Sequence, residues 1–536
     1  MELRSIKDVK SAEKFGIADV MKLIGAFVFI LLVIWYTSHL SSNMPEQTLL
    51  IVAAIFGGYM ALNIGANDVA NNVGPTVGAQ AITIFGAVII AAIFEASGAL
   101  VAGGDVVGTI KNGIINPALI KDTNTFIWIM MAALLAGAIW LNLATAFGAP
   151  VSTTHAIVGG VTGSGIAAAG FSVVSWGKMG EIVSSWIISP FLGGIIAAVF
   201  LLFIKKTIVN QDDKRLAAKA YVPSMIAFMT WAFSTYIILK GMNHLIHIGF
   251  IAAASIGLVL SVALFFVVKP AIAKMADALP NTRESVNKLF NIPLVFSAAL
   301  LSFAHGANDV ANAIGPLAGI YDALVSGGIS TSASIPMWVM VVGATGIVVG
   351  LALYGPKLIK TVGSEITELD QIRAFCVAMS AALTVIVASQ LGLPVSSTHI
   401  AVGAVFGVGF LREYLMNDRV KEVEEDLQQI KLDQEMEKLE EYKHALESLG
   451  KLKKVDPFLV KNLMNKINEE KAIIRNIYEG EIELSKVEKK ALKAVKKHEL
   501  VKRSALKMII AAWLITVPAS AILSAIFYYM IRGILL

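Results

Sequence analysis

Long uncharged apolar runs recur along this chain and predict an integral membrane protein built of helices. Residues 25–36 and 48–67 carry no charged side chain. About 20 such residues cross a bilayer as a helix, which satisfies its own backbone amides in lipid. The alternating pattern of a membrane barrel is absent from the sequence. We therefore expect an all-α fold with about a dozen transmembrane helices, some of them half-spans, at 21–40, 47–66, 78–102, 125–149, 151–170, 179–204, 221–240, 244–269, 291–305, 334–355, 372–393, 395–411 and 508–531.

The composition agrees with a membrane location. Hydrophobic residues make up 56% of the chain, charged residues make up 15%, and the mean hydropathy is +0.72. A soluble domain carries about 25% charged residues. Cys376 is the one cysteine, which excludes a disulfide within the chain and a multi-cysteine metal cluster. Polar residues follow the first apolar run where a signal peptide would carry small residues, so we expect a retained span.

Charged segments divide the chain into regions. Residues 205–219 and 269–288 are rich in Lys and Arg, which predicts that both loops are cytoplasmic, and the loop at 41–47, which has no basic residue, is expected to be external. Residues 412–507 mix both charge signs with apolar residues at helical spacing, which predicts a cytosolic helical insertion of two or three helices. Its role stays open between self-packing, regulation and dimerisation. The expected regions are 1–46, 47–204 (repeat 1), 205–288, 289–411 (repeat 2), 412–507 and 508–536.

Two motifs occur twice, in the same order. Residues 65–75 read GANDVANNVGP and residues 306–316 read GANDVANAIGP. Residues 148–155 read GAPVSTTH and residues 392–399 read GLPVSSTH. The first copy follows an external loop and the second follows a cytoplasmic loop. We therefore expect two inverted repeats, in which broken or re-entrant helices from both copies meet at a site near the membrane midplane, as in secondary transporters.

The first motif places acids inside apolar spans. A charge in such a position is costly and suggests function, although a carboxylate that caps a broken helix is an alternative. Amide side chains four residues apart flank each acid, and on a helix such pairs share one face. Carboxylate and amide oxygens, with carbonyls of an unwound Gly-Pro segment, would suit Na⁺ or a proton. The candidate ion ligands are Asn67, Asp68, Asn71, Asn308, Asp309 and Asn312, and Glu95 is a further candidate because it also lies within a span.

The second motif has the residues of a helix start, with Pro followed by Ser and Thr. Free amides at a helix start, the positive end of its dipole and nearby hydroxyls all favour an anion. Two such starts could hold one tetrahedral anion from both sides. Phosphate beside two acids needs cations or protons to offset the repulsion, which favours symport. The candidate substrate ligands are Asn67, Asp68, Ser152, Thr153, Thr154, Asn308, Asp309, Ser396, Ser397 and Thr398, with Thr109 and Thr361 as weaker ones.

Histidines accompany both motifs. His155 and His399 end the two hydroxyl motifs, and we favour hydrogen-bonded structural histidines over titrating ones. His305 precedes the second acid motif without a partner in the first copy, so we give it little weight. Arg373 opens a span and is expected near its end, which leaves no arginine near the midplane.

These duplicated motifs resemble the inorganic phosphate transporter family over roughly 47–411 and the final span. The resemblance implies phosphate symport with Na⁺ or H⁺, ion and phosphate binding at Asp68, Asp309 and the neighbouring Asn residues, and phosphate binding at the hydroxyls of the second motif. In this family the segment GANDVAN is usually followed by Ala. Here Asn72 follows the first copy and Ala313 follows the second. Equivalent ion sites in the two repeats are therefore not expected.

We expect a multi-pass protein of the cell membrane that imports inorganic phosphate with Na⁺, and no nucleic-acid partner. A proton-coupled phosphate or sulfate carrier is the nearest alternative. A membrane anion sensor that signals through the cytosolic helices is an alternative of another class. An enzyme is least favoured, because the sequence shows no nucleophile–base pair or cofactor motif. A homodimer is an arrangement that the sequence leaves open.

Overall fold

The computed structural model describes residues 16–42, 46–147, 151–241, 248–329, 335–365, 369–450, 457–478 and 503–535. Regular structure in these ranges is helical apart from one isolated β-bridge. Twelve of the described helical segments are long and apolar enough to cross a membrane. The expected all-α fold with about a dozen spans is therefore confirmed. Most of the N-terminal arm and residues 479–502 of the charged module lie outside the described residues.

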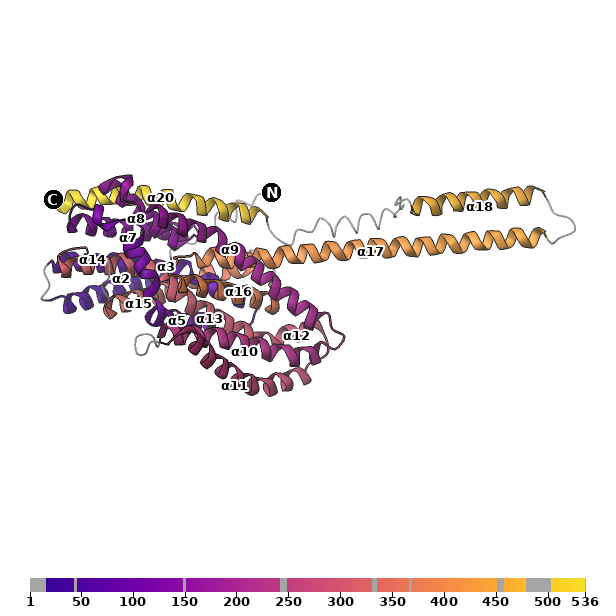
Figure 1. Ribbon diagram of the computed structural model, residues 1–536, viewed down its shortest axis with the longest axis horizontal. Coiled ribbons are helices and arrows are strands. Elements are labelled where there is room, and N and C mark those ends of the chain that lie inside the picture. The colour runs from indigo at the N-terminus through magenta and orange to yellow at the C-terminus, as the bar shows by residue number, and fades with distance from the viewer. Residues whose placement is uncertain are drawn as a thin grey trace. The chain divides into compact units, whose positions relative to one another are not determined.

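The larger of two units contains the membrane helices and comprises residues 1–408 and 501–536. Figure 1 labels its elements in chain order. They are α2 (Ile17–Leu40), α3 (Gln47–Asn67), α4 (Val69–Gly78), α5 (Ile84–Ala102), α6 (Gly104–Gly108), η1 (Thr109–Gly113), η2 (Pro117–Leu119), α7 (Thr123–Ala146), α8 (Thr153–Ala169), η3 (Phe171–Val173), α9 (Trp176–Ile204), η4 (Lys205–Val209), α10 (Lys214–Gly241), α11 (Phe250–Asp277), α12 (Arg283–Leu289), α13 (Asn291–Asp309), α14 (Ala311–Ser326), α15 (Met337–Glu365), α16 (Gln371–Gln390), the start of α17 (Ser397–Gly450) and α20 (Arg503–Leu535).

Two local pairings fix the directions of the spans. Ile115 and Val174 form an antiparallel bridge, so α7 and α8 make a hairpin whose two ends lie on the same side of the membrane. The backbone N–H of Lys214 donates to the side chain of Asn281, so α10 and α11 make a second hairpin. From the end of α4, α5 crosses to the opposite side, where the hairpin of α7 and α8 begins and ends, and α9 crosses back. The hairpin of α10 and α11 begins and ends on this side, so α13 enters from the side at which α4 ends. The two repeats are therefore inverted.

The 17-residue helix α8 is shorter than the span that we expected at 151–170, because it forms only the returning arm of the first hairpin. α16 and the start of α17 correspond to α7 and α8 in the second repeat. The core consists of small, branched, aromatic and Met side chains, and the buried residues of α7 and α16 run along nearly their whole length. α20 packs against α7 and α8.

Helices of the two repeats cross each other at glycines. α15 packs on α3, and α5 packs on α13. A Cβ on Gly350 would lie 1.8 Å from the carbonyl oxygen of Leu62, and a Cβ on Gly98 would lie 2.0 Å from that of Phe303. Only glycine permits so close a backbone approach, which is typical of helix contacts in membranes. The two crossings occupy corresponding places in the repeats.

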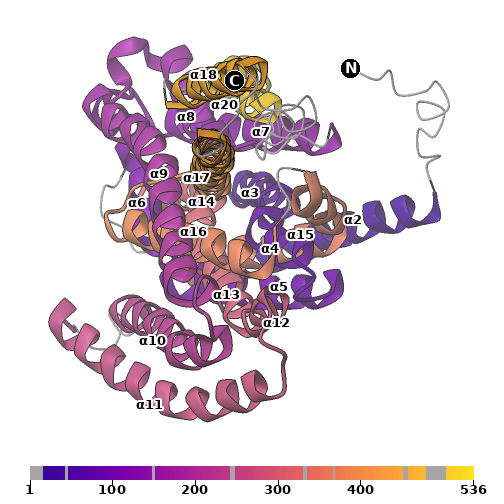
Figure 2. The same ribbon diagram turned by 90° about the vertical axis from the view of Figure 1, so that its right-hand side faces the viewer.

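The hairpin of α10 and α11 connects the repeats. Figure 2 shows these two helices side by side at the edge of the membrane unit. Many large apolar side chains of α11 are exposed, which suits contact with lipid. The most buried of the described spans are those of α13, α16 and α7.

The smaller unit comprises residues 409–500. Its described part contains the later turns of α17 and the helix α18 (Pro457–Tyr478). Lys466 of α18 lies 5.3 Å from the ring centroid of Tyr442 on α17, so the two helices form a hairpin. Lys438 and Glu435 form an ion pair on its surface. The expected helical insertion is confirmed over these residues.

Candidate substrate and ion site

Each copy of the acid motif lies at a break between two helices. α3 ends at Asn67 and α4 begins at Val69, with Asp68 between them. In the second copy α13 ends at Asp309 and α14 begins at Ala311. One residue separates the helices in each case. The breaks place two carboxylates in the protein interior, where each residue is 1% exposed.

We expected the Gly-Pro part of this motif to be unwound, and that expectation is wrong. Pro75 lies inside α4 and Pro316 lies inside α14. A helix in a membrane protein tolerates proline where neighbouring groups satisfy the freed carbonyl. The described oxygens around the acids therefore come from side chains rather than from an unwound Gly-Pro segment.

The second motif forms helix starts, as predicted. The Ser152 hydroxyl accepts a hydrogen bond from the His155 amide at 3.1 Å, and the Ser396 hydroxyl accepts one from the His399 amide at 3.3 Å. These two serines cap α8 and α17. The residues that follow them supply hydroxyls in the first helical turn, close to the acids.

Hydroxyls of both repeats bind both carboxylates. Thr153 Oγ1 donates to Asp68 Oδ2 at 2.8 Å and lies 3.4 Å from Asp309 Oδ2. Ser397 Oγ donates to Asp309 Oδ2 at 3.3 Å. Thr398 Oγ1 donates to Asp68 Oδ1 at 3.3 Å. Thr153 thus contacts both acids. The two carboxylates lie beside the starts of α8 and α17.

One asparagine of each repeat reaches the hydroxyls of the other repeat. Asn71 Nδ2 donates to Thr398 Oγ1 at 2.9 Å. Asn312 Nδ2 donates to Thr154 Oγ1 at 3.1 Å and to Thr153 Oγ1 at 3.2 Å. The two contacts correspond under the inverted repeat. They tie each acid-bearing helix break to the opposite helix start.

The other two asparagines bind within their own repeat. Asn67 Nδ2 donates to Thr145 Oγ1 at 2.9 Å, and Asn308 Nδ2 donates to Ser389 Oγ at the same distance. Each contact holds the break against the hairpin that carries the helix start. The asparagines four residues apart therefore have different partners, although the sequence suggested one shared face.

His305 belongs to this cluster, which the sequence interpretation missed. Its Nδ1 lies 2.6 Å from Glu95 Oε2, and its Nε2 lies 2.9 Å from Asp309 Oδ2. Glu95 also accepts a hydrogen bond from Asn72 at 2.7 Å. Ligand atoms of Asp68, His305 and Asp309 all lie within 4.8 Å of one another. Glu95 reaches the acids through His305. The available signal was spacing, since His305 and Asp309 are four residues apart on one helix.

Several buried acceptor oxygens have no hydrogen-bond partner among the described residues. They are Asn308 Oδ1, Asp309 Oδ1 and Asn312 Oδ1 of the second repeat, and Asn72 Oδ1 of the first. An unsatisfied buried acceptor costs about 1–3 kcal/mol. Oxygen atoms are the ligands that hard cations prefer. The donor set therefore fits a small cation beside Asp309.

Two polar contacts lie outside this cluster. Thr109 Oγ1 donates to the Gly392 carbonyl at 2.7 Å, and so holds the segment before the second helix start. Lys111 Nζ lies 2.8 Å from Asp322 Oδ2, and both residues have little exposure. The side chain of Thr361 is not described. Arg373 contacts Asp370 at the beginning of α16, at the end of its span as predicted.

The histidines of the second motif pack as rings. The centroids of His155 and His399 are 4.4 Å apart in an edge-to-face arrangement. Trp186 lies 3.8 Å from His155, and Trp513 lies 3.6 Å from His399. The buried ring nitrogens of both histidines make no hydrogen bond to a described side chain, so the structural role that we favoured stays a prediction that rests on these ring contacts. The four rings pack the ends of the two repeats and α20 together.

Inverted repeats that bring buried acids and hydroxyl-bearing helix starts to one place define a secondary transporter. Comparisons with known proteins identify its family. A model of the phosphate transporter family matches residues 64–524, and the chain belongs to this family. This assignment also agrees with the prediction that the protein is a transporter rather than an enzyme.

Relatives and a solved structure extend the comparison. A protein of Helicobacter pylori strain J99, with the name "Putative phosphate permease", is 50% identical over 531 residues, which cover 98% of each chain. A relative from Thermococcus kodakarensis with a similar name is 43% identical over 68% of this chain and 89% of its own. A solved structure with the name "The sodium-dependent phosphate transporter" matches with a TM-score of 0.72 and 31% identity, over 91% of this chain and 100% of that chain.

Proposed function

We propose that this phosphate transporter imports inorganic phosphate into the cell by symport with Na⁺. The observation that carries the proposal is the group of oxygens around Asp309 that have no hydrogen-bond partner among the described residues, beside two helix starts that present hydroxyls. The similar solved structure is that of a transporter whose name states sodium dependence, which supports the same ion. The cell membrane is the proposed location.

The contacts suggest how ion and phosphate binding are coupled. The hydroxyls of Thr153, Ser397 and Thr398 donate to the carboxylates of Asp68 and Asp309. A hydroxyl has one hydrogen to donate, so the same bond is not available to an anion. Na⁺ at the carboxylates would neutralise them and release these donors. Phosphate would then accept hydrogen bonds from the hydroxyls and the free amides at the two helix starts.

Charge gives the same order of binding. Phosphate carries a charge of about −1.5 to −2 near pH 7. No described lysine or arginine forms an ion pair with Asp68 or Asp309. Without cations, phosphate would meet two carboxylates in a region of low dielectric. Binding of Na⁺ first therefore explains why phosphate would not move alone. Alternating access would move parts of the two repeats against each other around this site.

A specific observation favours a proton as the alternative coupling ion. His305 lies between Glu95 and Asp309 and offers a place for a transported proton. Proton-coupled transport of phosphate is therefore the alternative function. Sulfate, which has the same tetrahedral shape, is the alternative substrate.

Uptake of radiolabelled phosphate into proteoliposomes tests these functions. Uptake is measured under an imposed Na⁺ gradient and, separately, under an imposed pH gradient. The wild type is compared with Asp68→Asn and Asp309→Asn. We expect uptake that is driven by Na⁺ alone and lost in both variants. Ser255→Ala, an exposed position on α11, serves as a control for substitution itself.

Other outcomes select the alternatives. Uptake driven only by the pH gradient would assign proton coupling and a direct role for His305. Absence of phosphate uptake by a folded protein under both gradients would contradict the proposal, and labelled sulfate is then the next substrate. Removal of residues 420–502 tests the sensor alternative. Uptake that persists after this removal would contradict an obligatory signalling role for the charged module.

A further inference from the structure

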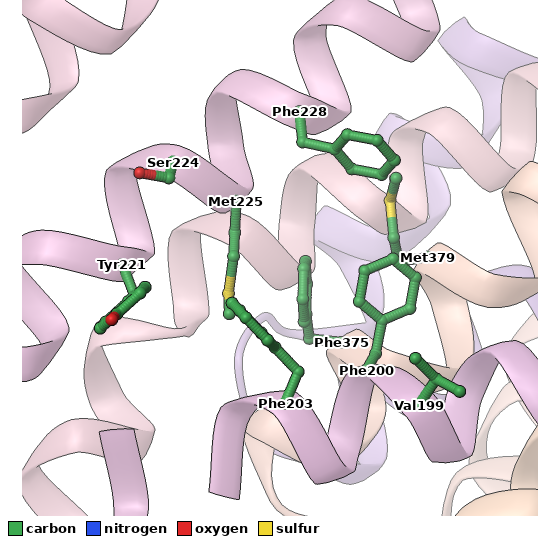
Figure 3. A pocket seen from close by; sticks show the side chains of 9 residues that line it. All are labelled: Val199, Phe200, Phe203, Tyr221, Ser224, Met225, Phe228, Phe375 and Met379. Carbon is green, nitrogen blue, oxygen red and sulfur yellow. The ribbon is translucent and has the colours of Figure 1, made fainter. Parts of the chain in front are cut away.

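An apolar cavity of about 350 Å³ lies beside α9, α10 and α16, away from the acids and helix starts. Figure 3 shows the aromatic and Met side chains of its lining gathered between these helices, with the short Ser224 side chain to one side. Phe203 comes from the last turn of α9, and Tyr221 and Phe228 come from α10. Phe375 and Met379 come from α16 and are fully buried. The volume lies within the range of small-molecule sites.

The lining of the cavity fits a hydrocarbon chain. It consists of aromatic, Met and Val side chains, apart from the hydroxyls of Tyr221 and Ser224. The Ser224 hydroxyl donates to the Ala220 carbonyl within α10, so it does not call for a polar ligand. Because burial without a hydrogen bond is costly for a polar group, the occupant is apolar where it enters. Phe203 and Phe228 are about 40% exposed at the mouth.

Basic residues mark the same end of these helices. Lys206 follows Phe203 by about one turn, is exposed, and has no ion-pair partner among the described residues. Residues 205–219 contain five Lys and Arg residues and two Asp residues. Lys219 is paired with Asp277, whereas Lys206 is exposed and lies about one turn beyond Phe203 at the mouth. A basic group at this level of a membrane attracts an anionic headgroup.

We propose that this cavity binds one acyl chain of an anionic phospholipid, with the headgroup at Lys206. The site lies where one helix of each repeat meets the connecting hairpin. α16 carries Phe375 and Met379 near its beginning and Ser389 near its end, where Ser389 accepts the hydrogen bond from Asn308. A bound chain therefore contacts the helix that positions one wall of the ion and substrate site.

Photolabelling tests the site without any measurement of transport. The protein is reconstituted with phosphatidylglycerol or with phosphatidylcholine, each bearing a diazirine on one acyl chain, and the labelled peptides are identified by mass spectrometry. We expect phosphatidylglycerol to label peptides that contain Phe203 and Met379. Ser224→Trp fills the cavity and removes this labelling. Val199→Trp does the same from the exposed mouth and is a second variant, should Ser224→Trp fail to fold.

Matched variants separate the chain from the headgroup. Lys206→Gln lowers the preference for phosphatidylglycerol over phosphatidylcholine about fivefold, as the loss of about 1 kcal/mol per basic residue predicts. Val259→Trp and Lys274→Gln, both exposed on α11, leave labelling of these peptides unchanged. Unchanged labelling in Ser224→Trp and Val199→Trp would overturn the site. Equal labelling by both lipids in the wild type would overturn the anionic headgroup.

Discussion

The two repeats supply matching acids and hydroxyls but surround them differently. Asp309 of the second repeat lies 2.9 Å from His305 and has one oxygen without a partner among the described residues. Both oxygens of Asp68 in the first repeat accept hydrogen bonds from hydroxyls. The position that corresponds to His305 is Ile64. The difference teaches that duplication supplies the framework, while a few unmatched polar residues favour an ion site in the second repeat.

A second difference lies away from the acids. Lys111 of the first repeat forms a partly buried ion pair with Asp322 of the second. When the matching glycines Gly98 and Gly350 are aligned, Lys111 corresponds to Gly363, and by the spacing of the first motif Asp322 corresponds to Ala81. The ion pair therefore joins the repeats at one end only. Its removal should show whether the two ends of the inverted fold depend on different interactions.

The largest expected effect comes from breaking that ion pair. Lys111→Met leaves the partly buried Asp322 carboxylate without its partner and should destabilise the protein by up to about 3–5 kcal/mol. The double variant Lys111→Met/Asp322→Leu should recover most of this loss, because it removes both charges. Thermal unfolding in detergent measures the change. A double variant as unstable as the single one would contradict this account.

The next effect separates the two helix starts. Thr153 contacts both acids, whereas Ser397 contacts only Asp309, at 3.3 Å. Loss of a hydrogen bond to a charged group costs about 1.5–3 kcal/mol, so Thr153→Ala should lower phosphate uptake roughly tenfold to a hundredfold. Ser397→Ala should lower it less, by about threefold to tenfold. Equal losses in initial uptake rates would argue that the hydroxyls act equivalently.

The helix crossings should respond alike in both repeats. Gly98→Ala and Gly350→Ala each push a methyl group against a backbone carbonyl. Overpacking of this kind costs about 1–3 kcal/mol, so both variants should lose similar stability. Gly180→Ala is the control, because nothing lies within 4 Å of its Cβ position. Unequal shifts in unfolding temperature would show that the two crossings do not carry the same constraint.

The smallest expected effect comes from making the first motif more like the second. Asn72→Ala removes the hydrogen bond to Glu95 and introduces the residue found at position 313. The cost is about 1 kcal/mol, or roughly fivefold in the Na⁺ concentration that gives half-maximal uptake. Ala313→Val, at the matching position of the second motif, is the control for a substitution at this place in the repeat. An Na⁺ dependence that Asn72→Ala leaves unaltered would place Asn72 outside ion binding.

The fold was predictable because its signals are long and repeated. Apolar runs identify the spans, and the two copies of each motif with opposite starting sides predict the inversion. The contacts of single side chains were less predictable. Pro75 and Pro316 remain helical because neighbouring helices support the chain, which no local pattern reveals. His305 was undervalued because its partner Glu95 is 210 residues away in the sequence.

The hydrogen bonds that cross between the repeats have a further consequence for the origin of such a site. Asn71 binds Thr398, and Asn312 binds Thr153 and Thr154, so each half completes the other half's polar surroundings. A half-length chain could build this arrangement only as an antiparallel pair, with equal numbers of molecules inserted in each orientation. Joining the halves in one chain removes that requirement. It also lets a residue such as His305 be present once, where a pair of identical chains would have to carry it twice.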